Sequence, residues 1–382
     1  MSSLLIVESP AKCSKIQGFL GPGWKVIATM GHIRSLEEDL GAVGLDRDFE
    51  PRYTFLKDKS KAIQQIKESA KAAKQVYLAS DDDREGEAIS YSVAVLLGLP
   101  VETTPRIVFH EITESAITTA IQNPKRINMN RAYAQQARAI LDMMVGFTIS
   151  PLLWKFVGSG LSAGRCQTPA LRLVQDREQE IVGFKAETSW AVQGNWVNRD
   201  GGSFEAQLTD RLEDEESASN YLENIHDDPN GKVIKAETVP TTLGAPKPLI
   251  TSTLQQEASG LYGYQPKSTM RSAQHLYEKG YITYMRTDNP VISEDAKLKA
   301  EAYVRVTYGE AYIQKAPVKQ LEGKKKLTKN TKAVEPQEAH EAIRPTDLDK
   351  IDLPLNEDWS AIDRKIYKLI WSRTIQSVMG SV

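Results

Sequence analysis

The sequence has little cysteine and lacks a long apolar run. Cys13 and Cys166 are its only cysteines. They lie far apart and in no metal-like spacing, which excludes a zinc ribbon and a disulfide framework and predicts two free thiols. No run of about 18 apolar residues that could span a bilayer is present. The N-terminus leads directly into a strand-like run without the pattern of a signal peptide, so we expect a cytoplasmic protein without a membrane segment.

An excess of positive charge is also missing, since the net charge is -2. The charge is nevertheless unevenly distributed along the chain. Residues 123–185 contain nine basic and four acidic residues, whereas residues 187–231 contain two basic and eleven acidic ones. Residues 315–332 hold seven lysines and one acid, which suits either a solvated loop or a contact with phosphates. A nucleic-acid partner is therefore compatible with the acidic total.

The 382 residues are enough for two or three domains, and the sequence patterns predict an α/β and α+β multidomain fold. Branched apolar runs at 4–7 and 76–79 are each followed by a polar turn and a helical pattern, which is typical of buried parallel strands. The predicted helices that follow them cover residues 10–20 and 84–97, the first with Ser9 as N-cap and Pro10 at its first position.

The pattern predicts four segments in chain order. We expect an α/β unit at 1–122 and a helical unit at 123–186. In the helical unit, one helix should run from its cap at Asn130 to about Ile149, and a second should begin at Thr168. Alternating apolar residues around a turn at 198–202 predict an antiparallel, β-rich segment at 187–250. Residues 251–382 should be mostly helical, with helices at 252–261, 266–279 and 357–379 and a short strand, YITYM, after Gly280.

Acidic residues gather where two predicted strands end. In the string SDDDREGEA at 80–88, Asp81 and Asp83 project to one side of an extended segment and Glu85 follows at a helix start. Three carboxylates could thus converge on one Mg²⁺, while simple capping of the helix is the alternative. Glu8 follows the first strand, and the carboxyl edge of a parallel sheet is where such folds place ligands. Lys12, one helical turn later, could meet a phosphate there.

Eight strings together resemble a known family. In order they are LIVESPAK at 5–12, GHIRSL at 31–36, DDDREGEA at 81–88, RIVFHEIT at 106–113, QARAILDMMVGF at 136–147, GLSAGRCQ at 160–167, YITYMRTD at 281–288 and AHEAIRPTD at 339–347. They resemble the catalytic portion of type IA DNA topoisomerases, specifically bacterial DNA topoisomerase I. The resemblance implies a Rossmann-like toprim domain at 1–122, part of a helical base at 123–186, the outward leg of a β-rich arch at 187–250, and a tyrosine-bearing helical domain at 251–382.

Tyr284 lies on the same side of the predicted strand as Arg286. A phenol with a pKa near ~10 is a weak nucleophile at neutral pH, and a nearby cation would favour the phenolate. From these residues alone a packing role for Tyr284 is the alternative. The resemblance implies instead that Tyr284 attacks a single-strand phosphodiester and becomes linked to the 5' phosphate.

The resemblance also implies roles for the surrounding residues. Glu8 would protonate the leaving 3' oxygen and act as base on religation, while Lys12 and Arg286 would stabilise phosphate charge. Asp81, Asp83 and Glu85, with Glu8, would hold the Mg²⁺ needed for religation and strand passage, and Asp288 would orient neighbouring groups. Single-stranded DNA would contact His32, Arg138, Asp142, Ser162, Arg165, Gln167, His340 and Arg344. Helical spacing equally allows a structural ion pair between Arg138 and Asp142.

The chain departs from the family pattern at Cys13, Cys166 and Asn289, and GRCQTPALRLV is closer to the topoisomerase III branch. It ends at Val382, about where the return leg of the arch would begin. The expected function is ATP-independent relaxation of negatively supercoiled DNA by a nucleoid-associated monomer. One rival is a remnant that binds single-stranded DNA without strand passage. Another is a toprim nuclease or primase relative, which would not need YITYMRTD.

Overall fold

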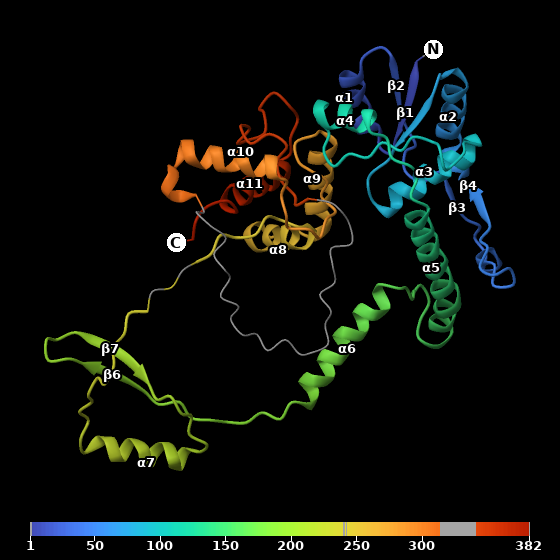
Figure 1. Ribbon diagram of the computed structural model, residues 1–382. Coiled ribbons are helices and arrows are strands. Elements are labelled where there is room, and N and C mark those ends of the chain that lie inside the picture. Colours follow the sequence, from blue (N-terminus) through green and yellow to red (C-terminus); the bar gives the residue numbers. More distant parts are fainter. Residues whose placement is uncertain (1, 240, 242, 314–340, 382) are drawn as a thin grey trace. The chain divides into compact units, whose positions relative to one another are not determined.

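The computed structural model describes residues 2–239, 241, 243–313 and 341–381. Its chain divides into two compact units (Figure 1). The first unit combines Met1–Ser162 with Thr242–Val382, and the second consists of Ala163–Thr241. The first unit therefore joins the two ends of the sequence, and it contains both the acidic string at 80–88 and Tyr284.

A parallel three-stranded sheet forms the N-terminal part of the first unit. Its order is β2-β1-β5, with β1 at Ser3–Val7, β2 at Trp24–Ala28 and β5 at Val76–Ala79. Val7 is paired with both Ala28 and Ala79, so the three strands end level with one another. Leu5 and Val7 belong to one hydrophobic cluster and Leu4 and Ile6 to another, because alternate residues of a strand face opposite sides. Both faces of β1 are thus buried, as the continuous apolar run predicts.

The helices around this sheet begin where their capping residues indicate. Ser9 caps α1 (Pro10–Leu20) through a bond from the Ala11 amide, and Asp83 caps α3 (Arg84–Leu97), so both predicted helices are confirmed. The remaining elements of this part are α2 (Ser60–Ala72), α4 (Glu114–Gln122) and the antiparallel pair β3 (Arg34–Leu36) and β4 (Tyr53–Phe55). Short 3-10 turns cover Leu40–Val43, Lys57–Lys59 and, later in the chain, Glu310–Tyr312.

The long helix α5 (Met129–Phe156) packs against α3 and differs from its prediction at both ends. Its N-cap is Asn128 rather than Asn130, because the Asn128 side chain accepts from the Arg131 amide. It also continues past residue 149 through Pro151. Contrary to the sequence expectation, an 18-residue window of α5 is long and apolar enough to span a membrane by length and composition alone. Its first half instead contributes Arg131 and Arg138 to ion pairs with the acidic string.

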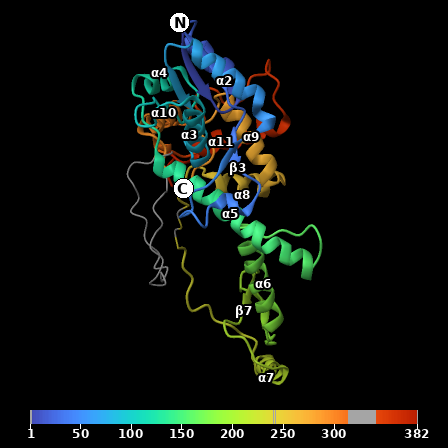
Figure 2. The same cartoon turned by 90° about the vertical axis from the view of Figure 1, so that its right-hand side faces the viewer.

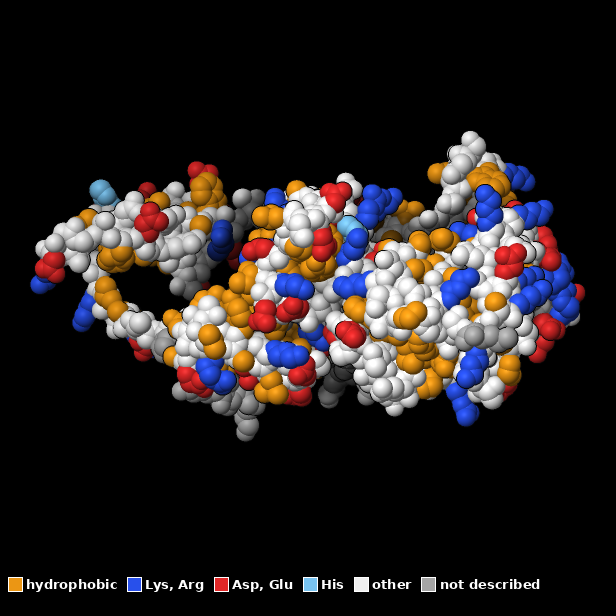
Figure 3. Space-filling model, turned by 90° about the horizontal axis from the view of Figure 1, so that it is seen from above, with side chains coloured by type: hydrophobic (Ala, Val, Ile, Leu, Met, Phe, Trp, Pro, Cys, Tyr) orange, Lys and Arg blue, Asp and Glu red, His pale blue; other side chains and the backbone are white. Residues whose placement is uncertain are grey.

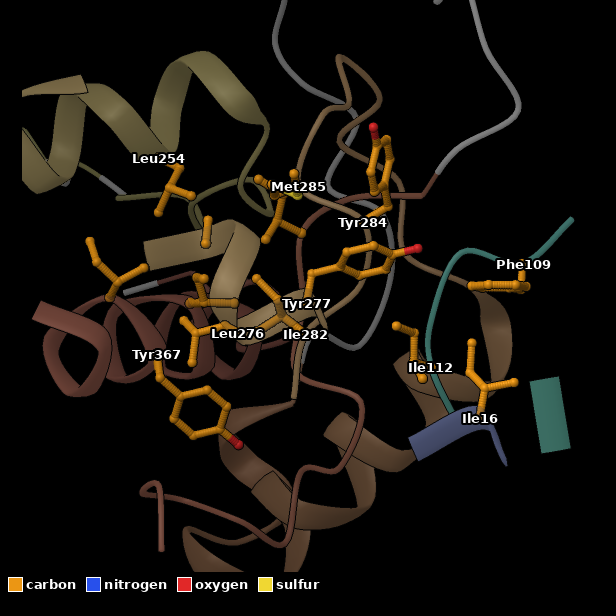
Figure 4. Packing of buried hydrophobic residues seen from close by; sticks show 14 of the residues in the cluster. Ile16, Phe109, Ile112, Leu254, Leu276, Tyr277, Ile282, Tyr284, Met285 and Tyr367 are labelled. Carbon is orange, nitrogen blue, oxygen red and sulfur yellow. The ribbon is translucent and has the colours of Figure 1, made fainter. Parts of the chain in front are cut away.

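The tyrosine-bearing part contains α8 (Thr251–Tyr262), α9 (Pro266–Glu278), α10 (Glu294–Thr307) and α11 (Ala361–Gln376). Helices α8, α9 and α11 pack together, as Figures 1 and 2 both show. Their apolar side chains share one cluster with residues of β1, α1 and α4, part of which appears in Figure 4. Helix α10 was not predicted from the sequence.

The segment after α9 is extended, but the predicted YITYM strand is wrong. Only an isolated bridge joins Ile282 to Pro345. The backbone instead bonds in two directions: the Thr283 amide donates to the Arg344 carbonyl (2.9 Å), and the Tyr284 amide donates to the His110 carbonyl (2.8 Å). Tyr284 is therefore attached directly to the loop that follows the N-terminal sheet.

The second unit contains α6 (Gln167–Gly183), a hairpin of β6 (Gln193–Val197) and β7 (Ser203–Gln207), and α7 (Glu215–His226). The hairpin turn lies at 198–202, where the sequence predicts it. Helix α7 was not predicted, although Asp214 caps it by accepting from the Ser217 amide at 2.7 Å. The strands described in this unit are confined to this hairpin and one bridge between Trp190 and Leu212.

Candidate active site

The acidic string forms a loop whose backbone is held by a buried arginine. Arg106 is completely buried and donates to the carbonyls of Ser80 (2.7 Å) and Asp81 (2.8 Å) while pairing with Glu87 at 3.3 Å. The loop is also tight, because a Cβ atom at Gly86 would lie 2.1 Å from the Asp81 carbonyl oxygen. Glycine is therefore required at 86, and the carboxylates of the loop have a defined direction.

The three consecutive aspartates point to different partners. Asp81 pairs with the buried ammonium of Lys12. Asp83 accepts from the Gly86 amide at 2.8 Å through one oxygen and from the Tyr284 hydroxyl at 2.5 Å through the other, which lies 3.4 Å from Arg286. Asp82 pairs elsewhere, as the alternation of an extended segment predicts, with Arg131 and, at 3.7 Å, His110.

Tyr284 borders a cavity of about 320 Å³ that it shares with the acids. The residues lining this active-site cavity are Glu8, Asp81, Asp83, Met270, Arg271, Gln274, Tyr284, Met285 and Arg286. The structure therefore brings together five predicted site residues from three distant strings. Sequence reasoning missed Arg271 and Gln274 of α9; their spacing of three, which places both on one helix face, was the only available signal.

The phenol of Tyr284 is held in its protonated form. Its side chain is 3% exposed, and burial followed by the charges of Asp81 and Asp83 raises its pKa well above 10. Arg286 acts in the opposite direction but is outweighed. The expectation that Arg286 would make Tyr284 a phenolate is therefore corrected: in this arrangement the hydroxyl keeps its proton and directs it at Asp83.

Glu8 is poised to exchange a proton near neutral pH. Burial, and then the neighbouring charge of Asp81, raise its pKa from 4.5 to about 7, while Lys12 opposes this shift. A carboxyl group with such a pKa can serve as acid in one step and base in the reverse step.

Comparison with known proteins agrees with this arrangement. The Toprim domain model matches residues 3–112, which contain the sheet and the acidic loop. The DNA topoisomerase model matches residues 126–382, which contain Tyr284. The chain belongs to the type IA DNA topoisomerase family. The solved structure of full-length topoisomerase I from Thermotoga maritima is 35% identical and superposes with a TM-score of 0.82 over 99% of this chain. This chain spans 61% of that protein's length.

Glu85 does not line the active-site cavity with the other predicted magnesium ligands, although it borders a neighbouring cavity together with Asp83. Its oxygens accept from His32 (3.0 Å), Gln135 (3.1 Å) and Arg138 (2.9 Å), and the hydrogen bond from His32 is the main cause of its lowered pKa. As they stand, Asp81, Asp83 and Glu85 do not line one cavity: Asp83 borders a cavity with each of the other two. Among the residues that the structure describes, no group of three or more His, Cys, Asp or Glu side chains is arranged to hold a metal ion.

Glu85 instead stands between two further cavities. One, of about 470 Å³, lies between Asp83, Glu85, Arg138, Arg286 and Asp288. The other, of about 520 Å³, is bordered by His32, Glu85 and Asp142 and by aromatic residues that sequence reasoning missed, Tyr53, Tyr91 and Phe147. Glu85 borders both of these cavities, and Asp83 and Arg286 border both the 470 Å³ cavity and the active-site cavity. We call the three neighbouring cavities together the Tyr284 groove. In it Arg34 stacks on Tyr53 (4.5 Å) and Tyr91 (5.2 Å).

The other predicted DNA contacts have varied positions. Arg138 is half-exposed and, besides Glu85, approaches Asp142 at 4.0 Å, so the structural ion pair is also present. Arg344 is buried and bonds to Glu341 (2.7 Å) and Glu111 (3.0 Å). Ser162 ends the first unit, and Arg165 and Gln167 belong to the second. His340 lies outside the described residues. Basic and acidic side chains are intermixed over the face shown in Figure 3, in keeping with the net charge of -2.

Proposed function

We propose that this chain cleaves and rejoins single DNA strands through Tyr284 and thereby relaxes negatively supercoiled DNA. The observation that carries the proposal is the hydroxyl of Tyr284, 2.5 Å from Asp83 at one end of the Tyr284 groove. A nucleophile needs a base within hydrogen-bond reach, and this pair satisfies that condition. The other features of the groove suit an extended single strand, with aromatic rings for bases and arginines for phosphates.

The chemistry follows from the positions of the side chains. The Tyr284 oxygen attacks the phosphorus as its proton passes to Asp83, and the bond between phosphorus and the 3' oxygen breaks. Glu8, protonated near neutral pH, gives its proton to that oxygen, which leaves a 5' phosphotyrosine and a free 3' hydroxyl. Arg286, which lines the cavity, stabilises the negative charge that develops on the phosphate. Lys12 is completely buried and paired with Asp81, so it would add to this stabilisation only by turning from Asp81 to the phosphate. Religation is the same sequence in reverse, with Glu8 as the base.

A divalent ion would be held by Glu8, Asp81 and Asp83 once their carboxylates turn towards one another, because among the described residues they do not form such a group as they stand. These three carboxylates line one cavity, and hard oxygen donors suit Mg²⁺. Glu85 is excluded from this set because its oxygens face His32, Gln135 and Arg138. When bound, Mg²⁺ would neutralise phosphate charge during religation. The partner would be single-stranded DNA, contacted by His32, Arg138 and Asp142 and by Ser162, Arg165, Gln167 and His340. The chain would act as a monomer on nucleoid DNA in the cytoplasm.

A labelled single-stranded oligonucleotide tests this proposal. After mixing and denaturation, a covalent 5' phosphotyrosyl adduct should form with the natural chain and not with Tyr284→Phe. An adduct of equal yield in the variant would refute Tyr284 as nucleophile. DNA binding without an adduct in either protein would favour the remnant that binds single strands. Relaxation of supercoiled plasmid then measures strand passage separately from cleavage.

A further inference from the structure

Tyr277 of α9 is completely buried beside the active-site cavity, and its hydroxyl has no hydrogen-bond partner among the described residues. Buried hydroxyl groups are nearly always paired, because an unpaired one loses its bonds to water without replacement. A phenylalanine would fill the same space without that loss. The hydroxyl of Tyr277 therefore destabilises the arrangement in which it is seen, which points to a second arrangement in which it has a partner.

The surroundings of Tyr277 identify that partner. Its ring packs edge-on against Tyr284 with centroids 5.1 Å apart, and Figure 4 shows the two rings next to each other. The Lys12 ammonium lies 4.9 Å from the centroid of the Tyr277 ring. Burial, and then the charge of Asp81, raise the pKa of the Tyr277 hydroxyl, so the hydroxyl keeps its proton. Asp81 is at present paired with Lys12.

Lys12 cannot serve Asp81 and a DNA phosphate equally well. In the proposed function its ammonium moves towards the phosphate. In the cleavage step, before a divalent ion is bound, Asp81, which is 5% exposed, would then be left as a buried charge without a cation. Such an uncompensated charge is strongly unfavourable, and a hydrogen bond to the charged oxygen reduces the cost.

We propose that Tyr277 is a positioning residue, whose hydroxyl donates to Asp81 when Lys12 turns to the phosphate and whose ring keeps Tyr284 in place meanwhile. The movement of Lys12 rests on the proposed function. The donor role of Tyr277 does not rest on it, because substitution of Lys12 removes the ammonium and makes the donor role measurable without DNA.

Thermal unfolding of four proteins tests the donor role: the natural chain, Tyr277→Phe, Lys12→Met and the double variant. Tyr277→Phe should leave the Tm unchanged or raise it when Lys12 is present. In a Lys12→Met background the same substitution should lower the Tm clearly, because Asp81 then depends on the hydroxyl. An equal loss of Tm in both backgrounds would show a merely structural tyrosine and overturn the inference. If Lys12→Met does not fold, Lys12→Gln replaces it.

Single-turnover cleavage of an oligonucleotide tests the role in the reaction. Tyr277→Phe should slow adduct formation about tenfold, the effect of one lost bond to a charged group, with the oligonucleotide Kd unchanged within about twofold. Tyr367→Phe is the matched control: Tyr367 is buried in the same cluster, but its hydroxyl donates to the Lys350 carbonyl at 2.5 Å. It should lower the Tm and leave cleavage intact. Unchanged cleavage in Tyr277→Phe refutes the inference. If the effect of Tyr277→Phe on Tm depends on Lys12 but the natural chain does not cleave DNA, only the proposed function is refuted.

Discussion

One oxygen of Asp83 accepts the Tyr284 hydroxyl at 2.5 Å, while its other oxygen accepts the Gly86 amide and caps α3. The helix start thus fixes the carboxylate that faces the nucleophile. The capping interpretation of the acidic string and the catalytic one are therefore compatible, because they use different oxygens of the same side chain.

This double use predicts a separation of stability from activity at Asp83. Asn is as good an N-cap as Asp, so Asp83→Asn should change the free energy of unfolding by less than about 1 kcal/mol. It cannot take the proton of Tyr284, and adduct formation should fall roughly 100-fold or more. Asp83→Ala should lose about 1 kcal/mol of stability in addition. Urea unfolding and single-turnover cleavage measure both; wild-type cleavage by Asp83→Asn would exclude Asp83 as the proton acceptor.

Glu8 should make both cleavage and stability depend on pH. Its pKa is raised from 4.5 to about 7 in the folded state, so folding favours the protonated form. This contribution to stability is complete below pH 4.5 and is lost as the pH rises through about 7. The Tm of the natural chain should therefore fall relative to Glu8→Gln between pH 5 and 8, and its cleavage rate should fall above about pH 7. A constant Tm difference over this range would contradict the assignment.

Arg106 should be essential for the acidic loop. Its guanidinium is completely buried with Glu87 and two loop carbonyls, so Arg106→Met leaves a buried carboxylate and unpaired carbonyl groups. We expect a loss of about 3 to 5 kcal/mol in the free energy of unfolding, which chemical denaturation measures. Arg52→Met is the control, because its ion pairs are exposed and should contribute about 1 kcal/mol or less. Similar losses in both variants would contradict the conclusion that Arg106 holds the backbone of the acidic loop.

Magnesium should stabilise the chain through the active-site cavity. A ligand present at ten times its Kd adds about 1.4 kcal/mol to the free energy of unfolding, which appears as a rise in Tm. Asp81→Asn should abolish the rise, whereas Glu85→Gln, which alters a residue outside that cavity, should retain it. Loss of the rise in both variants would instead restore the ligand set expected from the sequence, which contains Asp81 and Glu85, whereas retention in Asp81→Asn would contradict both sets.

Arg344 should be more important for stability than for DNA binding. It is buried and bonds to Glu111 and Glu341, which come from opposite parts of the first unit. Arg344→Ala should cost about 3 kcal/mol or more by removing the cation that both acids share. The oligonucleotide Kd of the folded fraction should change less than it does in Arg138→Ala. A larger change in Kd for Arg344→Ala would support the DNA contact predicted from the sequence.

The elements that sequence reasoning predicted well depend on local signals. Ser9, Pro10 and Asp83 determine helix starts through their own backbone neighbours, and the apolar run of β1 is buried on both faces. Local signals also mislead: Asn128 and Asn130 are equally suitable caps by type, and only the folded chain shows that Asn128 is used.

The site was only partly predictable because its geometry depends on contacts between distant segments. The strings named Glu8, Asp81, Asp83, Tyr284 and Arg286, which the structure brings to one cavity. Spacing could not show that Glu85 faces α5 instead, since that follows from the packing of α3 on α5. Nor could it show that burial raises the pKa of Tyr284 more than Arg286 lowers it, because the burial of Tyr284 depends on the whole hydrophobic cluster.

Gly280 lies just after the end of α9, on the path to Tyr284, and its φ is +71°. A Cβ atom there would lie 2.5 Å from the Ile112 carbonyl oxygen. Two stretches of chain that are more than 150 residues apart in sequence thus approach so closely that no side chain fits between them at this position. Adding a single methyl group at position 280 would act as a spacer between the loop at 110–112 and the Tyr284 segment, and would open the 2.8 Å bond between His110 and Tyr284 without altering any residue of the active-site cavity.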